Sequence, residues 1–511
     1  MGKKILMTGN EAIGRGAIEA GLSYATSYPG TPATEILQYL AKNFKGKAEW
    51  SINEKVALEV AIGVSFAGRR ALCSMKHVGL NVAADPLMTA AYLGARGGLV
   101  LVVADDPGAY SSQNEQDTRV FAAFAKLPVF EPSDSAEARD MVKKAFDLSE
   151  EYQLPVILRS LTRLSHSASP VEPQEIGKEN EINTSKDPSR FVAVPNHIVR
   201  LHKALNDKQA KLKEIGTKYN TLERTGSKKG IIAAGIGYAY AKEYSEGYSV
   251  LKVAFYPVKE ELIKEFVKDH EEVWVIEEGE PVVEELARRY SDKIKGKLSG
   301  HIKREGELGP DAVAAALKGI KPAAVKDLPK RPPVLCPGCG HRETFKALKA
   351  ANPSFITGDI GCYTLGFAPP LNAMDSCLCM GASIGKGIGI ASQGVKRVVS
   401  VIGDSTFMHS GITGLITAVN NKADLLIMIL DNSTTAMTGH QPTPLTGETA
   451  KGEKGGQINL EELVKACGAA SVDVIDPLKQ AELTALINKR FEEPGVKVII
   501  PRRACIFVKK A

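Results

Sequence analysis

The sequence has no long apolar run, and this absence excludes a membrane-spanning protein. No hydrophobic stretch reaches the ~18 residues that a transmembrane helix needs. Residues 1–7 are too short in apolar length for a secretory signal and instead predict a first β-strand. We therefore expect a cytoplasmic protein that neither crosses nor binds a membrane.

A strong charge of either sign is also missing. The net charge is only +6 over 511 residues, and aromatic residues make up 6% of the chain. No basic run alternates with aromatic residues, whereas a nucleic-acid-binding domain gathers its Lys and Arg on one patch or stripe. We therefore expect no nucleic-acid partner.

What the chain does contain is a regular alternation of short apolar runs and helical patterns. This alternation is typical of parallel sheets covered by helices, so we predict an α/β fold. The length indicates about three domains of ~150–200 residues. The first predicted block covers residues 1–170, and a linker that contains a charged helix at 196–222 follows at 171–225. The second block covers 226–325 and the third 331–511, and a Pro- and Lys-rich linker at 321–333 joins them.

The predicted strands are the framework for the candidate sites. They lie at 4–7, 48–52, 71–75, 98–103 and 155–158 in the first block, at 230–234 and 272–277 in the second, and at 398–402, 425–431 and 496–500 in the third.

Two strands of the third block end in polar residues. The strand at 398–402 is followed by Gly403, Asp404 and Ser405, and the next strand runs into Asn432 and Thr434. If the strands are neighbours, Asp404 and Asn432 lie at the same carboxyl edge, where open α/β sheets bind ligands. Either motif alone would predict only a strand-end turn.

Together these residues fit a magnesium-anchored diphosphate. Mg²⁺ prefers oxygen ligands that it shares with phosphates, Gly403 allows close backbone approach, and Ser405 opens a helix whose amides suit an anion. The arrangement resembles the thiamine-diphosphate signature, Gly-Asp followed one strand later by Asn. This resemblance implies that Asp404 and Asn432 hold Mg²⁺ through their side chains and Thr434 through its carbonyl.

Thiamine diphosphate also needs a carboxylic acid to activate its aminopyrimidine, and in this enzyme class a second α/β domain supplies it. Glu54 follows a predicted strand and begins an alanine-rich helix, where burial would favour the protonated form. The alternative is a glutamate placed at a helix N-terminus by the macrodipole. Glu54 is our candidate for the activating acid.

Three further residues of the first block are candidates for substrate contact. Thr31 lies in a rigid Tyr-Pro-Gly-Thr-Pro turn, and Lys76 and His77 follow a predicted strand. A hydroxyl and a cation at these positions suit the carboxylate of a 2-oxo acid. A purely structural role is the alternative for each of them.

The eight cysteines, in a chain without an export signal, indicate a reducing compartment, where clustered cysteines more often bind metal than form disulfides. Cys336 and Cys339 form a Cys-x-x-Cys pair, and Cys362 and Cys505 lie further along. Zinc, a four-iron cluster, a catalytic dithiol and free thiols all remain open. An electron acceptor has a role beside thiamine diphosphate, so we favour the cluster.

The other four cysteines are expected in the core. If Cys505 is not a cluster ligand, two of these four are the candidates to replace it. The core set is Cys73, Cys377, Cys379 and Cys467, and the substitutes are Cys377 and Cys379.

Nearly the whole chain resembles the large subunits of indolepyruvate ferredoxin oxidoreductases, within the 2-oxoacid:ferredoxin oxidoreductases. The resemblance rests on the segments 9–13, 28–32, 75–86, 336–341, 403–405 and 431–434. It implies three doubly wound domains, namely two thiamine-diphosphate-binding folds flanking a transketolase C-terminal-like domain. It also implies that Cys336, Cys339, Cys362 and Cys505 hold a [4Fe-4S] cluster and that Gly340 and His341 contact the cofactor.

The same resemblance implies an activity. It is the oxidative decarboxylation of an aryl pyruvate to an acyl-CoA, with coenzyme A as cosubstrate, a small β subunit as partner and a dimer of heterodimers as the assembly. Electrons would pass to ferredoxin or another external acceptor. Relatives usually carry a C-terminal ferredoxin-like domain that the given sequence lacks, which leaves the acceptor open. A non-redox thiamine-diphosphate decarboxylase or carboligase and a non-catalytic cofactor-binding subunit are the alternatives.

Overall fold

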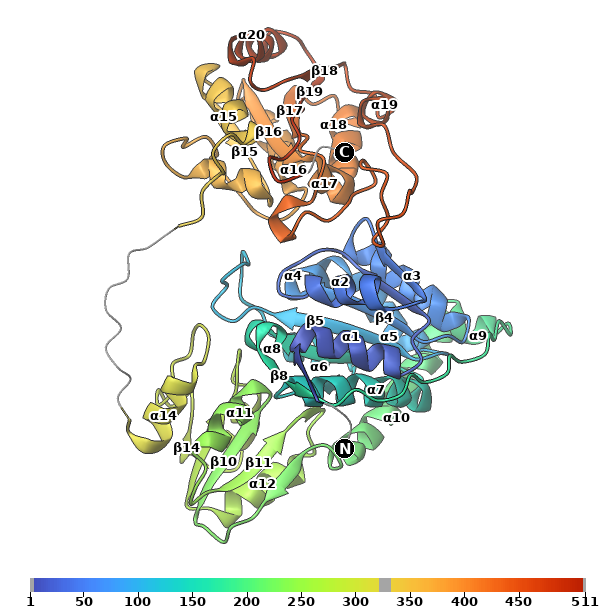
Figure 1. Ribbon diagram of the computed structural model, residues 1–511, viewed down its shortest axis with the longest axis vertical. Coiled ribbons are helices and arrows are strands. Elements are labelled where there is room, and N and C mark those ends of the chain that lie inside the picture. Colours follow the sequence, from blue (N-terminus) through green and yellow to red (C-terminus); the bar gives the residue numbers. More distant parts are fainter. Residues whose placement is uncertain (1–3, 321–331, 509–511) are drawn as a thin grey trace. The chain divides into compact units, whose positions relative to one another are not determined.

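The computed structural model describes residues 4–320 and 332–508 of the chain. Its internal contacts form two units, Met1–Lys326 and Asp327–Ala511. Figure 1 shows sheets covered by helices in each unit, which confirms the α/β prediction. Most of the predicted linker at 321–333 lies outside the described residues. The first unit contains both the first and the second predicted blocks.

The main sheet of the first unit has the strand order β12-β6-β7-β5-β4-β2-β3. Every neighbouring pair is parallel except β12 and β6. Strands β4, β5 and β7 are buried along their whole length, as expected of strands covered on both faces. The strands are β2 (Tyr24–Ser27), β3 (Lys47–Trp50), β4 (Ala71–Lys76), β5 (Leu99–Asp105), β6 (Val129–Phe130), β7 (Val156–Leu161) and β12 (Phe255–Tyr256).

The helices of this part follow the strands in the expected alternation. They are α1 (Gly9–Glu19), α2 (Thr34–Asn43), α3 (Glu54–Phe66), α4 (His77–Val82), α5 (Ala84–Leu93), α6 (Thr118–Ala125), α7 (Ser135–Tyr152) and α8 (Thr162–His166). The predicted first strand is present as β1 (Ile5–Thr8), but it does not join the main sheet. It pairs antiparallel with β8 (Ala168–Val171), where the predicted linker begins.

The charged helix ends earlier than its sequence pattern predicts. After the short α9 (Pro188–Phe191), α10 covers Pro195–Gly216 and buries Leu201, Leu205 and Leu212 on one face. The side chain of Asn220 accepts hydrogen bonds from the amides of Ala254 and Phe255 and donates to the Phe255 carbonyl. This buried contact turns the chain into β9 (Thr221–Glu223).

A second sheet completes the first unit, with the order β14-β13-β10-β11-β9 and only β9 antiparallel. Because β12 of this region pairs with β6 of the main sheet, backbone hydrogen bonds join the two α/β parts. The elements are β10 (Lys229–Ala234), α11 (Ile236–Glu243), β11 (Ser249–Val253), α12 (Glu260–Asp269), β13 (Glu272–Ile276), α13 (Val282–Arg288), β14 (Ile294–Lys295) and α14 (Pro310–Lys318).

A buried ion network adds to this connection. Arg159 on β7 donates to Asp105 at 2.7 Å, and Arg119 on α6 donates to Asp117 at 2.6 Å and to Glu277 at 2.7 Å. All five side chains are almost completely buried. Since Glu277 follows β13 of the second sheet, the network fixes the second part of this unit onto the first.

The second unit contains a parallel sheet with the order β15-β16-β17-β19-β18. The three predicted strands are confirmed as β16 (Val398–Gly403), β17 (Leu425–Leu430) and β19 (Val496–Pro501), and β15 (Phe355–Thr357) and β18 (Ser471–Ile475) are additional. The helices are α15 (Gly340–Ala350), α16 (Ala382–Ala391), α17 (Asp404–Thr406), α18 (Ile412–Asn420), α19 (Leu460–Ala466) and α20 (Gln480–Phe491), with a π turn at Phe407–Gly411.

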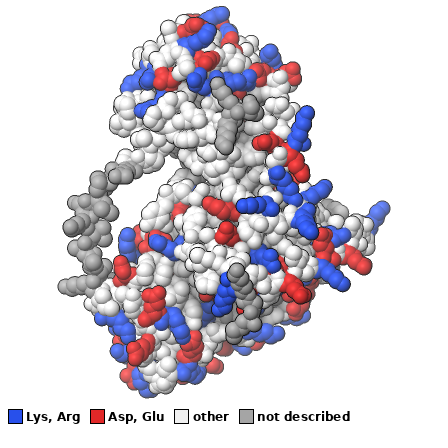
Figure 2. Space-filling model, in the orientation of Figure 1, with Lys and Arg blue, Asp and Glu red and all other residues white. Residues whose placement is uncertain are grey.

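Charges of both signs are mixed on the visible surface. On the face shown in Figure 2, Lys and Arg are interspersed with Asp and Glu. Among residues 4–320 and 332–508, no helix combines the length and the apolar character needed to cross a bilayer.

Replacing Arg159 by Met should destabilise the first unit strongly. The change removes the Arg159 ion pairs of the buried Asp105 and Glu131 carboxylates, and breaking a buried pair costs about 3–5 kcal/mol. Urea unfolding followed by circular dichroism measures this loss. Arg224→Met removes an exposed pair with Asp269 and should leave the unfolding midpoint nearly unchanged. Equal shifts in the two variants would contradict a stabilising role for the network.

Candidate active site

The carboxyl ends of β16 and β17 bring the predicted diphosphate-site residues together. The two strands are parallel neighbours, and Gly403 pairs in register with Leu430. Asp404 is therefore adjacent to Asp431, and its carboxylate accepts a hydrogen bond from the Ser433 amide at 3.0 Å. Gly403 is required here because a Cβ would lie 2.6 Å from the Tyr363 ring.

Two aspartates lie close together at these strand ends, and burial disfavours the charged form of Asp404. Burial and the neighbouring Asp431 carboxylate raise the pKa of Asp404 well above its usual range, and Arg502 compensates Asp431 through a 2.6 Å ion pair. In the described part of the chain, no three His, Cys, Asp or Glu side chains are arranged as a metal site. The predicted magnesium ligands are of another kind, since they comprise one carboxylate, one amide and one backbone carbonyl.

The remaining predicted residues of this edge lie close by. Thr434 donates its amide proton to the Asn432 side-chain oxygen at 3.3 Å, and Ser405 and Thr435 share a 2.8 Å hydroxyl contact. Asp404 begins a helical segment that continues through the π turn to Asn420. These donor groups suit a diphosphate bound through magnesium.

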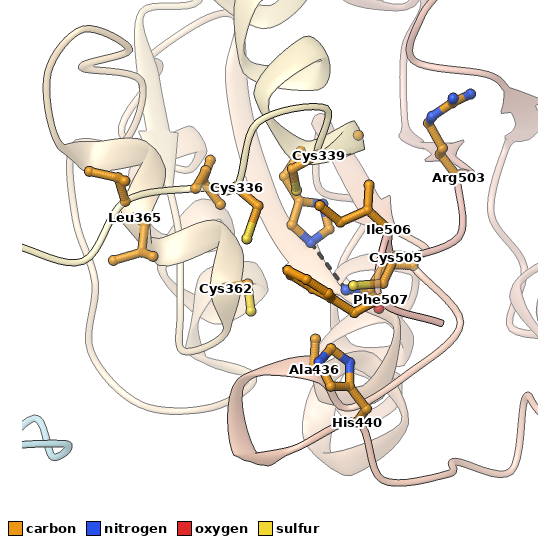
Figure 3. Close-up of a pocket in the computed structure, with 15 residues that line it drawn as sticks. Cys336, Cys339, Cys362, Leu365, Ala436, His440, Arg503, Cys505, Ile506 and Phe507 are labelled. Carbon is orange, nitrogen blue, oxygen red and sulfur yellow. Dashed lines mark hydrogen bonds between the residues drawn. The ribbon is translucent and has the colours of Figure 1, made fainter. Parts of the chain in front are cut away.

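A second group of predicted residues meets in one pocket. Cys336, Cys339, Cys362 and Cys505 all line a cavity of about 140 Å³, and Figure 3 shows their side chains gathered around one space. This volume is below the roughly 300–1,000 Å³ of pockets for organic ligands. Among the described residues, the four thiols are not arranged as a ready-made metal site.

The thiols are close enough to influence one another. Burial, and then the neighbouring Cys339, Cys505 and Cys336, raises the pKa of Cys362 to about 11. Burial also raises the pKa of Cys339. A metal centre that binds thiolates would relieve this penalty, because metal binding displaces the thiol protons.

The cysteine pocket meets the strand ends at Asn432. His341, the second residue of α15, is buried, and this burial lowers its pKa to about 4, so the ring is neutral. Its Nε2 lies 3.3 Å from Asn432 Nδ2, and both side chains line the cysteine pocket together with Gly340. The Cys505 amide donates to the Asn432 carbonyl at 2.9 Å. Asn432 thus connects the predicted magnesium site with the four cysteines.

The expectation that Cys377 and Cys379 belong to the core is wrong. Both are exposed, and neither lines the cysteine pocket. Ser376 pairs with Thr357 at the last residue of β15, so the segment that follows extends beyond the sheet, and Leu378 is 60% exposed as well. Apolar neighbours in the sequence misled the prediction. Cys73 is buried as expected, and Cys467 is partly buried at the end of α19.

In the first unit, Glu54 lies at the predicted corner between a strand and a helix. It is the first residue of α3, directly after the capping residue Asn53, and is 5% exposed. Helix α4 runs against its carboxyl group. A Cβ on Gly79 would lie 2.6 Å from Glu54 Oε1, so glycine at position 79 makes room for the buried acid.

Thr31, Lys76 and His77 are brought together by a loop that sequence reasoning missed, residues 106–117. The Ser111 carbonyl accepts from Lys76 Nζ at 2.5 Å, the Ser111 hydroxyl donates to the Thr31 carbonyl at 3.3 Å, and Asn114 contacts His77 Nε2 at 3.2 Å. Two aspartates directly after a predicted strand were a signal for this loop, because they lie at the same carboxyl edge as Lys76.

Comparison with known proteins agrees with this geometry. The family model "Thiamine pyrophosphate enzyme, C-terminal TPP binding domain" matches residues 359–500, and "Pyruvate flavodoxin/ferredoxin oxidoreductase, thiamine diP-bdg" matches residues 15–225. The indolepyruvate oxidoreductase subunit IorA of Archaeoglobus fulgidus is 43% identical over 99% of this chain and 87% of its own length. The chain belongs to the indolepyruvate oxidoreductase subunit IorA family.

A second member of the IorA family, from Pyrococcus horikoshii, is also 43% identical, over 99% of this chain and 86% of its own length. A solved 2-oxoglutarate:ferredoxin oxidoreductase from Magnetococcus marinus superposes with a TM-score of 0.49 at 18% identity, covering 57% of this chain and 61% of that one. The first family model includes Asp404 and Asn432, and the second includes Glu54.

A bulky maleimide should distinguish the exposed cysteines from the buried one. Cys377 and Cys379 are exposed, whereas Cys73 is fully buried and burial raises its pKa to about 12. Since the thiolate is the reactive form, we expect Cys377 and Cys379 to react more than about tenfold faster than Cys73. Peptide mass spectrometry of the folded protein measures the rates. Labelling of Cys73 at the same rate would contradict the fold around β4.

Proposed function

We propose that this chain is the catalytic subunit of a thiamine-diphosphate-dependent oxidoreductase that converts an aryl 2-oxo acid, of the indolepyruvate type, to an acyl-CoA. The names of its relatives support the substrate. The observation that carries the proposal is the shared position of Asn432 and His341, which line the four-cysteine pocket next to the strand end of Asp404. Cofactor chemistry and electron removal would then occur side by side.

The second unit would hold the diphosphate. Asp404, Asn432 and the Thr434 carbonyl are the proposed Mg²⁺ ligands, and the absence of a Cβ at Gly403 and the Ser405 hydroxyl favour close approach of the phosphates. When bound, thiamine diphosphate supplies an electron sink that lets a 2-oxo acid lose CO₂. We assign residues 1–170 and 331–511 to the two thiamine-diphosphate-binding domains and residues 226–325 to the transketolase C-terminal-like domain, with the segment 171–225 between them.

The first unit would supply the acid and the substrate anchor. Glu54, through its buried carboxyl group, would be the residue that hydrogen-bonds to the aminopyrimidine of the bound cofactor. Thr31, Lys76 and His77 bind and orient the 2-oxo acid, and their position at the same sheet edge as the corner of Glu54 makes this division of roles consistent.

The four cysteines would hold a [4Fe-4S] cluster, since soft thiolate ligands select iron–sulfur centres and the pocket offers four of them. Bound there, the cluster supplies a one-electron acceptor. We propose a small β subunit as partner, ferredoxin or another protein as the external acceptor, and a dimer of heterodimers as the assembly.

Changing Glu54 to Gln should lower kcat by about 100-fold or more, because the amide cannot supply the acidic proton. The assay is anaerobic reduction of a viologen dye with indolepyruvate and coenzyme A, using the chain copurified with its small subunit. Glu59→Gln is the matched control, since Glu59 is on the same helix and pairs with Lys55 at the surface. Full turnover by the Glu54 variant would refute the assignment of the acid.

Changing Cys339 to Ser should abolish most of the bound iron. The parent protein is expected to hold about four iron atoms per chain after anaerobic purification, and the variant should lose the cluster absorbance. Cys377→Ser is the control because Cys377 does not line the pocket. One zinc atom and no iron in the parent would overturn the cluster and the redox reaction.

A further inference from the structure

The loop at residues 106–117 is held in place by one carboxylate. Asp106 directly follows β5 and is fully buried. Its Oδ2 accepts from the Ser112 hydroxyl at 2.6 Å and from the Ser111 amide at 2.8 Å, and its Oδ1 accepts from the Thr162 hydroxyl at 2.8 Å. The Ser111 hydroxyl, whose single proton can go to either Asp106 or the Thr31 carbonyl, lies 3.2 Å from Oδ2. Three independent hydrogen bonds therefore end on this single side chain.

Apolar packing contributes little to the position of this loop. Residues 108–116 are all exposed or partly buried, and Tyr110 at the tip is 71% exposed. Hydrogen bonds must therefore set where the loop lies. Besides those to Asp106, they include the contacts of Ser111 with Thr31 and Lys76 and of Asn114 with His77. One more runs from the Gly108 amide to the Glu115 side chain and one from Asn81 to Gln116. Loss of the Asp106 contacts would loosen the Ser111 end.

The Ser111 end is the part that contacts Lys76. The Lys76 ammonium donates to the Ser111 carbonyl at 2.5 Å and is 3.4 Å from the Ser111 hydroxyl. An ammonium group has three donors, so one remains for a ligand after both contacts to Ser111. Lys76 is only 7% exposed, and an ionic contact in such a poorly solvated place is strong.

We propose that Asp106 is a positioning residue: it fixes Ser111, and through Ser111 it aims Lys76, so that the remaining N–H of Lys76 binds the carboxylate of an aryl 2-oxo acid. This inference rests on the proposed function, and it assigns the loop at residues 106–117 to the anion subsite of that reaction.

The charges support the geometry. Burial would raise the pKa of Asp106, but hydrogen bonds from Ser112, Ser111 and Thr162 and the charge of Lys76 lower it below its usual range, so the carboxylate stays ionised. Burial lowers the pKa of Lys76 to about 8, and Asp106 opposes this shift. The other titratable group on which Asp106 acts is His166 on α8, which is paired with Glu35.

The sign of the pH dependence follows from these shifts. An anion that needs the Lys76 cation binds below the pKa of Lys76 and is released as the pH rises through it. Without the Asp106 charge, Lys76 would lose its proton at a lower pH. The release of the anion should therefore move to lower pH in Asp106→Asn.

The test uses the chain copurified with its small subunit and loaded with thiamine diphosphate and magnesium. Binding of phenylpropionate, an unreactive aryl carboxylate, is measured by calorimetry between about pH 6 and about pH 10, together with KM for indolepyruvate. Asp106→Asn should weaken binding and raise KM about tenfold at neutral pH, and its binding should be lost at lower pH than in the parent.

Two variants separate charge from position. Ser112→Ala removes the 2.6 Å hydrogen bond without changing any charge, so it should weaken binding and leave the pH of release unchanged. Asp134→Asn is the control, because Asp134 caps α7 through the Glu137 amide and does not contact the loop at residues 106–117. It should behave like the parent.

Parent-like affinity and parent-like pH dependence in Asp106→Asn would overturn the proposal. If that variant does not fold, an unchanged affinity in Ser112→Ala would overturn it instead. A parent enzyme that turns over no aryl 2-oxo acid would refute the proposed function, whereas normal turnover in the parent and in Asp106→Asn would refute only the positioning role.

Discussion

The parallel pairing of β16 with β17 is the contact on which the second unit depends. Its register places Gly403 beside Leu430, and from this alone Asp404 and Asp431 become neighbours at the carboxyl edge. The resulting repulsion between buried carboxylates is offset on one side by Arg502. A one-residue slip would exchange the two faces of the strand and separate Asp404 from Asn432, so the sheet core and the candidate site are stabilised by the same register.

In the first unit, hydrogen bonds and buried ion pairs hold the candidate site residues in place. Asp105 and Asp106, consecutive at the end of β5, have different tasks. Asp105 pairs with Arg159 inside the network that joins the two sheets, and Asp106 fastens the loop that contacts Lys76. Because the strand is rigid and buried, two adjacent carboxylates can serve the connection of the two parts and the candidate substrate site without competing.

Much of the candidate site was predictable because its signals are local. These signals depend on neighbouring residues and on a simple alternation of strands and helices. They are the strand-end pair Gly403–Asp404, the Cys336–Cys339 spacing and the corner at Glu54. Three features were not predictable, because they depend on partners distant in sequence. They are the loop at residues 106–117, the exposure of Cys377 and the early end of α10. Asn220, for example, ends α10 by binding the backbone of residues 254 and 255.

The position of Cys505 has a consequence for how the second unit assembles. Cys336 and Cys339 precede every strand of this sheet and Cys362 follows only β15, whereas Cys505 follows the last strand, β19. A cofactor held by all four would tie the two ends of the sheet's chain into one closed loop, in the way that a staple does. Oxygen damage to such a centre would then do more than stop electron transfer. The segment after β19 would detach, and the hydrogen bond from the Cys505 amide to the Asn432 carbonyl would be lost.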